Sequence, residues 1–169
     1  MLTPMRFQRA VGGLAISAGM PSESHTGYRM QALELYRQAW LRGVMRRARA
    51  TLMGKRQRLE SLAAAGDEAQ IAGRHYAGRK TVPLARICGS DNRCADYDAG
   101  FHPVGQHTRD RWVNVAVARF QGIPLPPIDL IKIGEQYYVL DGHNRVSVAK
   151  ALRQRDIEAE VTVWERAEA

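Results

Sequence analysis

The stretch that decides the fold runs from Ile123 to Glu165 and reads IPLPPIDLIKIGEQYYVLDGHNRVSVAKALRQRDIEAEVTVWE. Its run IDLIKI (128–133) is largely apolar on both faces of an extended chain, which favours a strand covered on both sides. After a short Gly-Glu reversal, YYVL (137–140) is rich in aromatic and β-branched residues and predicts a strand that pairs back as a hairpin. IEAEVTVW (157–164) alternates apolar and polar residues and predicts a half-buried strand.

Between the hairpin and the last strand, the sequence predicts a sharp turn into a helix at Asp141-Gly142-His143-Asn144-Arg145. A glycine lets the backbone turn tightly and approach a ligand closely. The first turn of a helix presents unpaired N–H groups at the positive end of its dipole, where an oxyanion fits. Arg145 can bind that anion with two parallel hydrogen bonds, and His143 and Asn144 add donors or acceptors. The alternative is an ordinary strand-to-helix turn, with Asp141 capping the helix and Arg145 solvated.

The run LDGHNRVSVAKAL, between a YYV strand and an IEAEV strand, resembles the ParB/sulfiredoxin superfamily over roughly residues 123 to 164. The resemblance implies an α+β fold: a small mixed sheet with flanking helices, preceded here by a basic helical segment. It also implies that the turn grips nucleotide phosphates, with Gly142 and Arg145 matching the motif. The expected cofactor is then a nucleoside triphosphate with Mg²⁺.

Two departures from the family pattern limit the activity that the resemblance implies. Sulfiredoxins carry a nucleophilic cysteine immediately after the glycine, where this chain has His143, so reductase chemistry is not expected. The partition proteins continue into a helix-turn-helix DNA reader, which is not expected here because few residues follow the predicted last strand. If the protein hydrolyses a nucleotide or nucleic acid, His143 is the available general base, because its unperturbed pKa lies near neutrality.

A long polar loop, CGSDNRCADYDAGFHPVGQHTRDRW (88–112), is the second stretch that indicates a function. Loops of this length are usually functional or disordered. We expect it to form a wall over the turn at Gly142, with ligand-binding side chains drawn from His102, His107, Arg93 or Arg109. A surface loop held by its own polar side chains is the alternative. The two cysteines and two histidines lack the tight Cys-x₂₋₄-Cys spacing of structural zinc sites, so no metal site is predicted.

Charge is concentrated near the N-terminus. The chain carries a formal charge of +8, and residues 28–65 account for +7 of it, with nine basic and two acidic residues. Apolar residues recur at close to a 3.6 period from Met30, which predicts a helix to Ala65 that Gly54 can divide. Three interpretations remain open: a solvated basic face, a nucleic-acid contact, or a contact with an acidic protein or membrane headgroups. The nucleic-acid interpretation rests on Arg42, Arg46, Arg47, Arg49, Lys55 and Arg56.

The remaining segments complete the predicted organisation. Residues 1–27 are interrupted by glycine, proline and serine and are expected to form a disordered leader, followed by the helical segment 28–66. Asp67 to Arg79 is expected to be a helix end or short helix with a loop, and the sheet domain is expected over 80–165. Within that domain, Thr81–Ile87 is expected to be extended, and a helix is expected over Arg109–Gln121, capped by Thr108 and ended by Gly122.

Two function classes follow. The first is a nucleotide- or nucleic-acid-binding protein that uses the turn at Gly142, either without hydrolysis or as a weak triphosphatase or nuclease. The second is a non-catalytic interaction module whose basic helix docks an acidic partner. No window approaches the roughly 20 apolar residues of a membrane span, and two cysteines form no disulfide framework, so a cytoplasmic location is expected.

Overall fold

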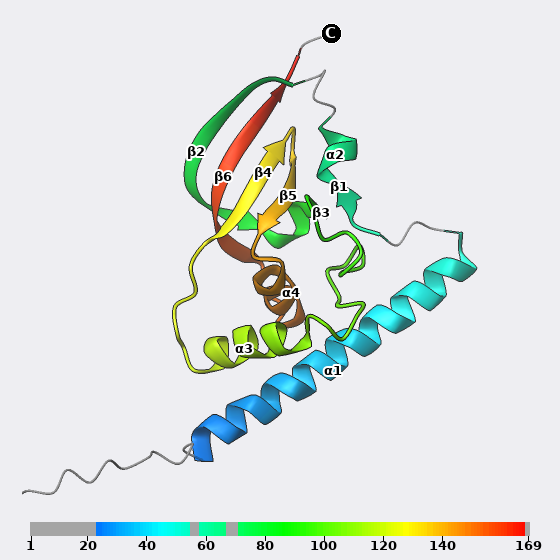
Figure 1. The fold of residues 1–169 in the computed structure, drawn as a ribbon, viewed down its shortest axis with the longest axis vertical. Coiled ribbons are helices and arrows are strands. Elements are labelled where there is room, and N and C mark those ends of the chain that lie inside the picture. Colours follow the sequence, from blue (N-terminus) through cyan, green and yellow to red (C-terminus); the bar gives the residue numbers. More distant parts are fainter. Residues whose placement is uncertain (1–22, 55–57, 67–70, 168–169) are drawn as a thin grey trace, which may run out of the picture.

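The computed structural model describes residues 23–54, 58–66 and 71–167. Three α-helices longer than one turn and six strands make up this part of the chain (Figure 1). The elements in chain order are α1 (Glu23–Leu52), β1 (Glu60–Ser61), α2 (Leu62–Ala65), β2 (Ile71–Pro83), the 3₁₀ turn η2 (Leu84–Arg86), β3 (Ile87–Ser90), α3 (Arg109–Phe120), β4 (Ile128–Ile133), β5 (Gln136–Asp141), α4 (His143–Ala151) and β6 (Asp156–Arg166).

The six strands form one mixed sheet in the order β1-β3-β5-β4-β6-β2. The hairpin β4–β5 is antiparallel, as the sequence predicts, and occupies the centre of the sheet. β6 runs parallel to β4 on one side of the hairpin, and β3 runs parallel to β5 on the other. β2 pairs antiparallel with β6 along one edge. The α+β fold class is therefore confirmed. In Figure 1 α1, α3 and α4 lie toward one end of the sheet and α2 lies apart from them beside it; α4 packs with Ile128 and Leu130 on one face of β4, and Leu62 of α2 packs with Ile131 and Ile133 on the other.

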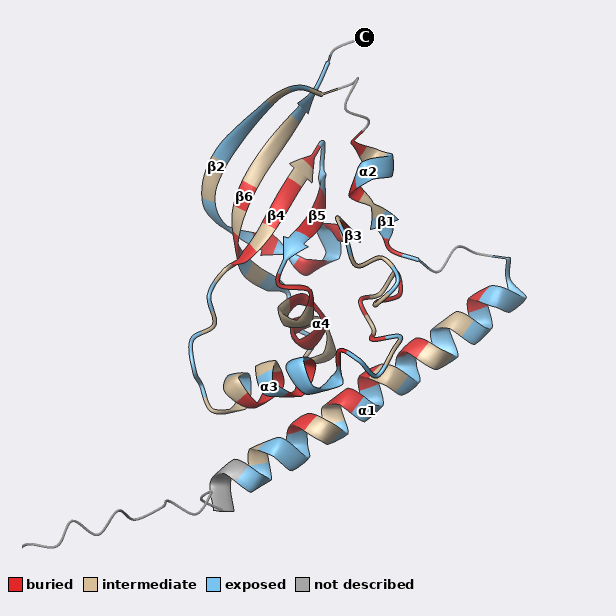
Figure 2. Cartoon of the chain, viewed as in Figure 1, coloured by how far each residue is buried: buried red, intermediate tan, exposed pale blue. Residues whose placement is uncertain are grey.

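Apolar side chains form three clusters. The largest packs the sheet against α4 and the loop after β3, and includes the fully buried Ile128, Val139 and Val146. A second cluster joins α1, α3 and α4 around Trp112, which is 0% exposed. A smaller one lies around Leu62 and includes side chains of β4 and β5. Burial in Figure 2 follows this layering: buried residues concentrate in β4, β5 and α4, and α1 buries only the side that faces the domain.

The N-terminal helix is shifted from its predicted bounds. Residues 1–22 of the expected leader lie outside the described part, but residues 23–27 already belong to α1, so the leader prediction is wrong for them. The helix also ends at Leu52 rather than Ala65. Gly54 adopts a φ of +64°, a left-handed conformation that ends helices readily. After the gap at 55–57 the chain forms β1, which pairs parallel with β3.

The prediction of a helix end and loop over Asp67–Arg79 is also wrong. Residues 67–70 lie outside the described part, and the rest of this range belongs to β2, a 13-residue strand. The sheet therefore begins well before residue 80. The sequence of β2 lacks the usual alternation of apolar and polar residues. β2 is an edge strand with most side chains exposed, so burial does not require that alternation. Register shifts near Gly73 and Gly78 interrupt it further.

The helix before the central hairpin lies where the sequence predicts it. α3 begins at Arg109 directly after Thr108, and Gly122, with a φ of +70°, follows its end. Thr108 makes no side-chain capping bond to the helix; its hydroxyl instead donates to the carbonyl of Gly105 at 3.5 Å. Across the described residues, no helix is long and apolar enough to cross a membrane.

Candidate functional site

The turn from β5 into α4 depends on Gly142. Its φ is +97°, a conformation that side chains disfavour, and a Cβ atom here would lie 2.4 Å from Cγ2 of Ile128. The first intrahelical hydrogen bond runs from the N–H of Val146 to the carbonyl of Gly142. No side chain among the described residues caps the helix. The N–H groups of the first turn are thus left without an intrahelical partner and can donate to a ligand.

Arg145 holds this turn against the segment that leads into β4. Its Nη1 donates to the carbonyls of Pro126 and Pro127 at 2.6 and 2.7 Å, and its Nη2 donates to Asp141 Oδ2 at 2.7 Å. Asp141 therefore binds Arg145 rather than capping α4. The arginine lines the cavity described below, but much of its donor capacity is already used within the protein, so it serves first as a clamp on the turn.

His143 is buried beneath the turn. It is 5% exposed, and its Nε2 lies 2.7 Å from the hydroxyl oxygen of Ser90, which also accepts the backbone N–H of Arg93 at 3.0 Å. The ring of Tyr97 stacks on the imidazole with 6.2 Å between centroids. Burial, helped by the charge of Arg93, lowers the pKa of His143 to about 4. The imidazole is therefore neutral at pH 7 and engaged with Ser90, so action as a general base would require that contact to break.

Asn144 is fixed from the same side. Its Oδ1 accepts a 2.6 Å hydrogen bond from the hydroxyl of Tyr97, whose pKa is raised mainly by burial. Tyr97 is 1% exposed and belongs to the loop after β3. The loop predicted to wall the turn thus contacts it through two side chains, Ser90 and Tyr97, that the sequence did not single out.

A cavity of about 360 Å³ opens at the N-terminus of α4. Three arginines from three elements line it: Arg93 from the loop after β3, Arg111 from α3 and Arg145 from α4. Arg93 Nη1 pairs with Asp96 at 3.2 Å. Arg111 is exposed and has no ion-pair or hydrogen-bond partner among the described residues. The other lining residues are Val115, Leu125, Pro126, Asp141, Gly142, His143 and Asn144. The cavity therefore combines excess positive charge with the unpaired N–H groups of the turn.

A second cavity of similar size adjoins the first and shares Leu125, Pro126 and Arg145 with it. Polar and charged side chains dominate the rest of its lining, chiefly Thr81, Arg119, Gln154, Asp156 and Glu158. Arg145 thus stands between a basic cavity and one that carries carboxylates and an amide.

The remaining side chains proposed for the ligand do not line the cavity at the turn. His107 Nε2 bonds to Asp96 Oδ1 at 2.9 Å, and Arg109 lies in a separate groove between α1 and α3. His102 Nδ1 bonds to Asp98 Oδ1 at 3.0 Å, close to α1. Sequence reasoning missed Arg111, which lies between Asp110 and Trp112 with no local signal that connects it to a turn thirty residues later.

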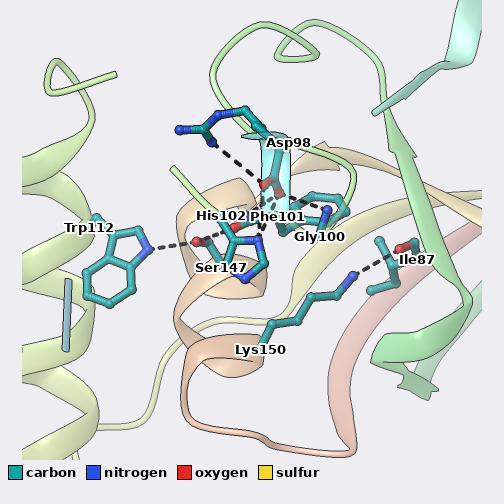
Figure 3. A network of polar contacts seen from close by, with 9 residues as sticks. Ile87, Asp98, Gly100, Phe101, His102, Trp112, Ser147 and Lys150 are labelled. Carbon is teal, nitrogen blue, oxygen red and sulfur yellow. Dashed lines mark hydrogen bonds and ion pairs between the residues drawn. The ribbon is translucent and has the colours of Figure 1, made fainter. Parts of the chain in front are cut away.

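A polar network beneath α1 uses His102 instead (Figure 3). Asp98, which is 1% exposed, accepts hydrogen bonds from the backbone N–H groups of Gly100 and His102 and lies 3.7 Å from Nη1 of Arg47. Burial opposes ionisation of Asp98, but the hydrogen bonds from His102 outweigh it and lower the pKa of the carboxyl. Farther along, the Ser147 hydroxyl accepts from Trp112 Nε1 and donates to the carbonyl of Phe101. This network fastens the loop to α1 and α4.

The network also changes the predicted nucleic-acid surface on α1. Arg47 points into the domain toward Asp98, with its Nη1 buried, so it is not a free surface charge. Arg42, Arg46 and Arg49 are exposed. Lys55 and Arg56 lie outside the described residues.

The cysteines and possible metal ligands form no site in the described residues. Cys88 and Cys94 are both free thiols, and burial raises the pKa of each. They pack against different apolar clusters, Cys88 with the one around Leu62 and Cys94 with the main core. Over the described ranges, no group of three or more His, Cys, Asp or Glu side chains is placed to hold a metal ion.

Comparison with known proteins gives a match among solved structures. The fold is similar to sulfiredoxin from Arabidopsis thaliana, with 19% sequence identity, a TM-score of 0.38, and coverage of 49% of this chain and 82% of that chain. No family model and no curated protein matches the sequence.

Proposed function

We propose that this protein binds the phosphate groups of a nucleotide in the cavity at the Gly142 turn. The observation that carries the proposal is the convergence of Arg93, Arg111 and Arg145 on the N-terminus of α4. Helix N-termini favour anions, and arginine matches phosphate oxygens with parallel donors. Among the described lining residues only Asp141 carries a carboxylate, and its Oδ2 is paired with Arg145. The cavity therefore suits an anion better than a cation or an apolar ligand.

A nucleoside triphosphate fits the arrangement better than a single phosphate ion. The adjoining cavity begins on the other side of Arg145, so a ligand could place its phosphates beside Arg111 and its sugar and base beside Gln154 and Asp156. Carboxylates and amides are suitable partners for ribose hydroxyls and base edges. Because Asp141 is already paired, a Mg²⁺ ion would be held chiefly by the phosphate oxygens and would arrive with the nucleotide.

We propose binding rather than hydrolysis as the function of this site. His143, the general base expected from the sequence, is buried, neutral and engaged with Ser90. Its contacts support a role in positioning: it orders the first turn of α4 whose N–H groups would meet the phosphate. Hydrolysis would need a water-activating group that these contacts do not supply.

The test compares two arginines on the same helix. Arg111 and Arg109 are both exposed on α3, but only Arg111 lines the cavity at the turn. Calorimetric titration with CTP, ATP, GTP and inorganic triphosphate, with and without Mg²⁺, should give saturable binding to the wild-type protein. Arg111→Ala should weaken that binding by roughly 10- to 150-fold, since a charged hydrogen bond contributes about 1.5–3 kcal/mol, and Arg109→Ala should not change it.

Three outcomes would count against the proposal. Equal losses in the two variants would indicate general charge attraction rather than a site. Binding of a short DNA duplex that neither variant alters, but that falls steeply with salt, would move the function to the exposed arginines of α1. No binding of any nucleotide at millimolar concentration would reject the nucleotide assignment. In that case a protein-interaction role, for which α1 offers a surface, would be the better-supported function.

A further inference from the structure

The outer side of α1 carries an apolar stripe that nothing in the described structure covers. Leu41, Met45, Ala48 and Leu52 are all exposed, with Leu41 41%, Met45 72% and Leu52 89% exposed. Their spacings of four, three and four residues are those of the core positions of a coiled coil. At about 100° per residue the four side chains lie within roughly 60° of one another on the helix. We call Leu41, Met45, Ala48 and Leu52 the α1 seam.

The α1 seam is separate from the surface that attaches the helix to the domain. In the described part of α1 the buried residues are Ala32, Tyr36, Ala39, Gly43 and Ala50, and the first three belong to the cluster that joins α1 to α3. These positions lie about half a turn around the helix from the seam. In Figure 2 the exposed residues of α1 run along the side that faces away from the domain. The helix thus buries one face within the protein and leaves a second, apolar stripe exposed.

The charged residues of α1 indicate which kind of partner the seam can bind. From Leu35 to Leu52 the sequence has five arginines and no acidic residue. Arg42 and Arg49 lie on one flank of the seam and Arg37, paired with Glu34, lies near its other flank. In a coiled coil such flanking positions set partner choice by pairing with opposite charges. A second copy of this helix would place arginine against arginine in either orientation, so self-association is disfavoured.

The shape of the seam distinguishes a protein helix from a lipid surface. Helices that lie in a membrane interface use a broad apolar face with tryptophan, phenylalanine or several leucines. The α1 seam is one stripe wide, and its four residues include no aromatic side chain. The opposite face of α1 already packs in the domain core. A narrow stripe with heptad spacing matches the core positions of one facing helix.

We propose that the α1 seam docks an acidic amphipathic helix of a partner protein, with leucine-type side chains between Met45 and Leu52 and carboxylates against Arg42 and Arg49. The seam spans three turns, so the contact is small and a dissociation constant of about 1 to 50 µM is expected. This inference does not depend on the cavity at the Gly142 turn.

The test uses a fluorescent synthetic peptide of four heptads, with leucine at the core positions and glutamate at the flanking positions. A second peptide with lysine at the flanks serves as its control. Fluorescence anisotropy should show binding of the acidic peptide to the wild-type protein and none of the basic one. The double variant Met45→Ser/Leu52→Ser should weaken binding at least tenfold. Ile123→Ser removes an apolar side chain that is 49% exposed elsewhere, and should leave binding unchanged.

A second pair of variants separates the apolar stripe from its charged flanks. Arg42→Gln/Arg49→Gln should weaken binding and remove its salt dependence, whereas Arg111→Ala, in the cavity, should have no effect. Circular dichroism and thermal unfolding should confirm that all variants fold, because every substituted side chain is exposed.

Each contrary result overturns the proposal in a distinct way. Peptide binding that survives Met45→Ser/Leu52→Ser but disappears without the arginines would indicate a basic surface rather than a seam. Binding of phosphatidylglycerol vesicles in preference to the peptide would assign the seam to a membrane. Dimerisation lost in the double variant, measured by sedimentation, would assign it to a second copy. No binding of the acidic peptide at about 100 µM would reject a helical partner of this kind.

Discussion

The ring Nε2 of His143 lies 2.7 Å from the hydroxyl of Ser90, and neither side chain is more than 5% exposed. The contact joins the end of β3 to the start of α4, and Lys150 of α4 also donates to the carbonyl of Ile87 in β3. The buried surroundings also disfavour the doubly protonated, charged form of the imidazole. Protonation of His143 should therefore destabilise the folded protein, so its stability should depend on pH.

Stability should fall as the solution is acidified through the range in which His143 titrates. The ordinary pKa of 6.5 applies to the unfolded chain, and burial lowers it to about 4 in the folded protein. Between these values the unfolded chain binds a proton that the folded protein excludes, so the free energy of unfolding decreases with falling pH. The loss from this group should approach about 3 kcal/mol near pH 4. Urea unfolding at pH 7.5 and pH 5 measures it, and His143→Asn should reduce the difference. An equal difference in that variant would assign the effect to other groups.

Replacing the serine tests the same contact at constant pH. Ser90→Ala leaves the N–H of Arg93 and Nε2 of His143 without their partner in a buried site. The free energy of unfolding at pH 7.5 should drop by about 1–3 kcal/mol. Asn92→Ala changes an exposed side chain two residues away and should stay within about 0.5 kcal/mol of wild type.

Two glycines with positive φ should respond differently to alanine. Gly142 and Gly122 have φ values of +97° and +70°, but a Cβ on Gly142 would strike Ile128, whereas one on Gly122 would meet nothing within 4 Å. Gly122→Ala should therefore cost only the conformational penalty of about 1–2 kcal/mol. Gly142→Ala adds steric overlap and should cost roughly 3–5 kcal/mol. Thermal unfolding of both variants provides the measurement, and similar losses would show that the turn shifts freely away from Ile128.

Two glycines within α1 should give changes of opposite sign. A Cβ on Gly43 would lie 2.7 Å from Cβ of His102 and 2.9 Å from Nη1 of Arg47, whereas Gly27 has open space. Gly27→Ala should stabilise the protein by up to about 1 kcal/mol through helix propensity. Gly43→Ala gains the same propensity but forces α1 away from the loop, and should destabilise by about 1–3 kcal/mol. Chemical denaturation of the two variants gives the change in free energy of unfolding for each. A stabilising Gly43→Ala would mean that α1 does not pack tightly against the loop at this point.

Arg145 and Asp141 form an ion pair whose two members should not matter equally. The arginine side chain is 15% exposed and also donates to the carbonyls of Pro126 and Pro127, while the aspartate side chain is 70% exposed. Arg145→Lys loses the planar geometry that reaches both carbonyls and should cost about 1–3 kcal/mol. Asp141→Asn removes a surface ion pair and should cost less than about 1 kcal/mol. Denaturant midpoints compare the two, and a larger effect for Asp141→Asn would show that the ion pair, rather than the carbonyl bonds, holds the turn.

The sequence predicts best those elements whose buried side chains recur at a regular spacing. β4 and β6 and the turn at Gly142 follow from short patterns, because each strand has a buried face and the turn needs a glycine. β2 could not be recognised in the same way, since an exposed edge strand places few constraints on its side chains. The end of α1 at Leu52 was not fixed by its apolar repeat. That repeat mixed residues of the buried face with Leu41 and Leu52, which face solvent.

Most of the candidate site was predicted only where its residues are adjacent in the chain; Arg93, named from the distant loop, also lines the cavity. The five residues from Asp141 to Arg145 were recognised together, but Ser90, Tyr97 and Arg111 reach the turn from distant segments. His102 and His107 were plausible by residue type, yet their contacts with Asp98 and Asp96 hold the loop together. Which polar side chain of a loop meets a ligand depends on the loop's path, and residue type does not encode that path.

The order of the strands has a consequence for synthesis on the ribosome. β2 is made early, but its partner in the sheet is β6, with Ile71 opposite Arg166 and Pro83 opposite Asp156. Until β6 emerges, β2 is a nascent segment with unsatisfied backbone groups on both sides, open to pairing with neighbouring chains. Its irregular register near Gly73 and Gly78 and its charged residues Arg74, Arg79 and Lys80 make it a poor template for such pairing. The irregular register and charged side chains that made β2 hard to recognise in the sequence would thus limit its pairing with other chains until β6 is synthesised.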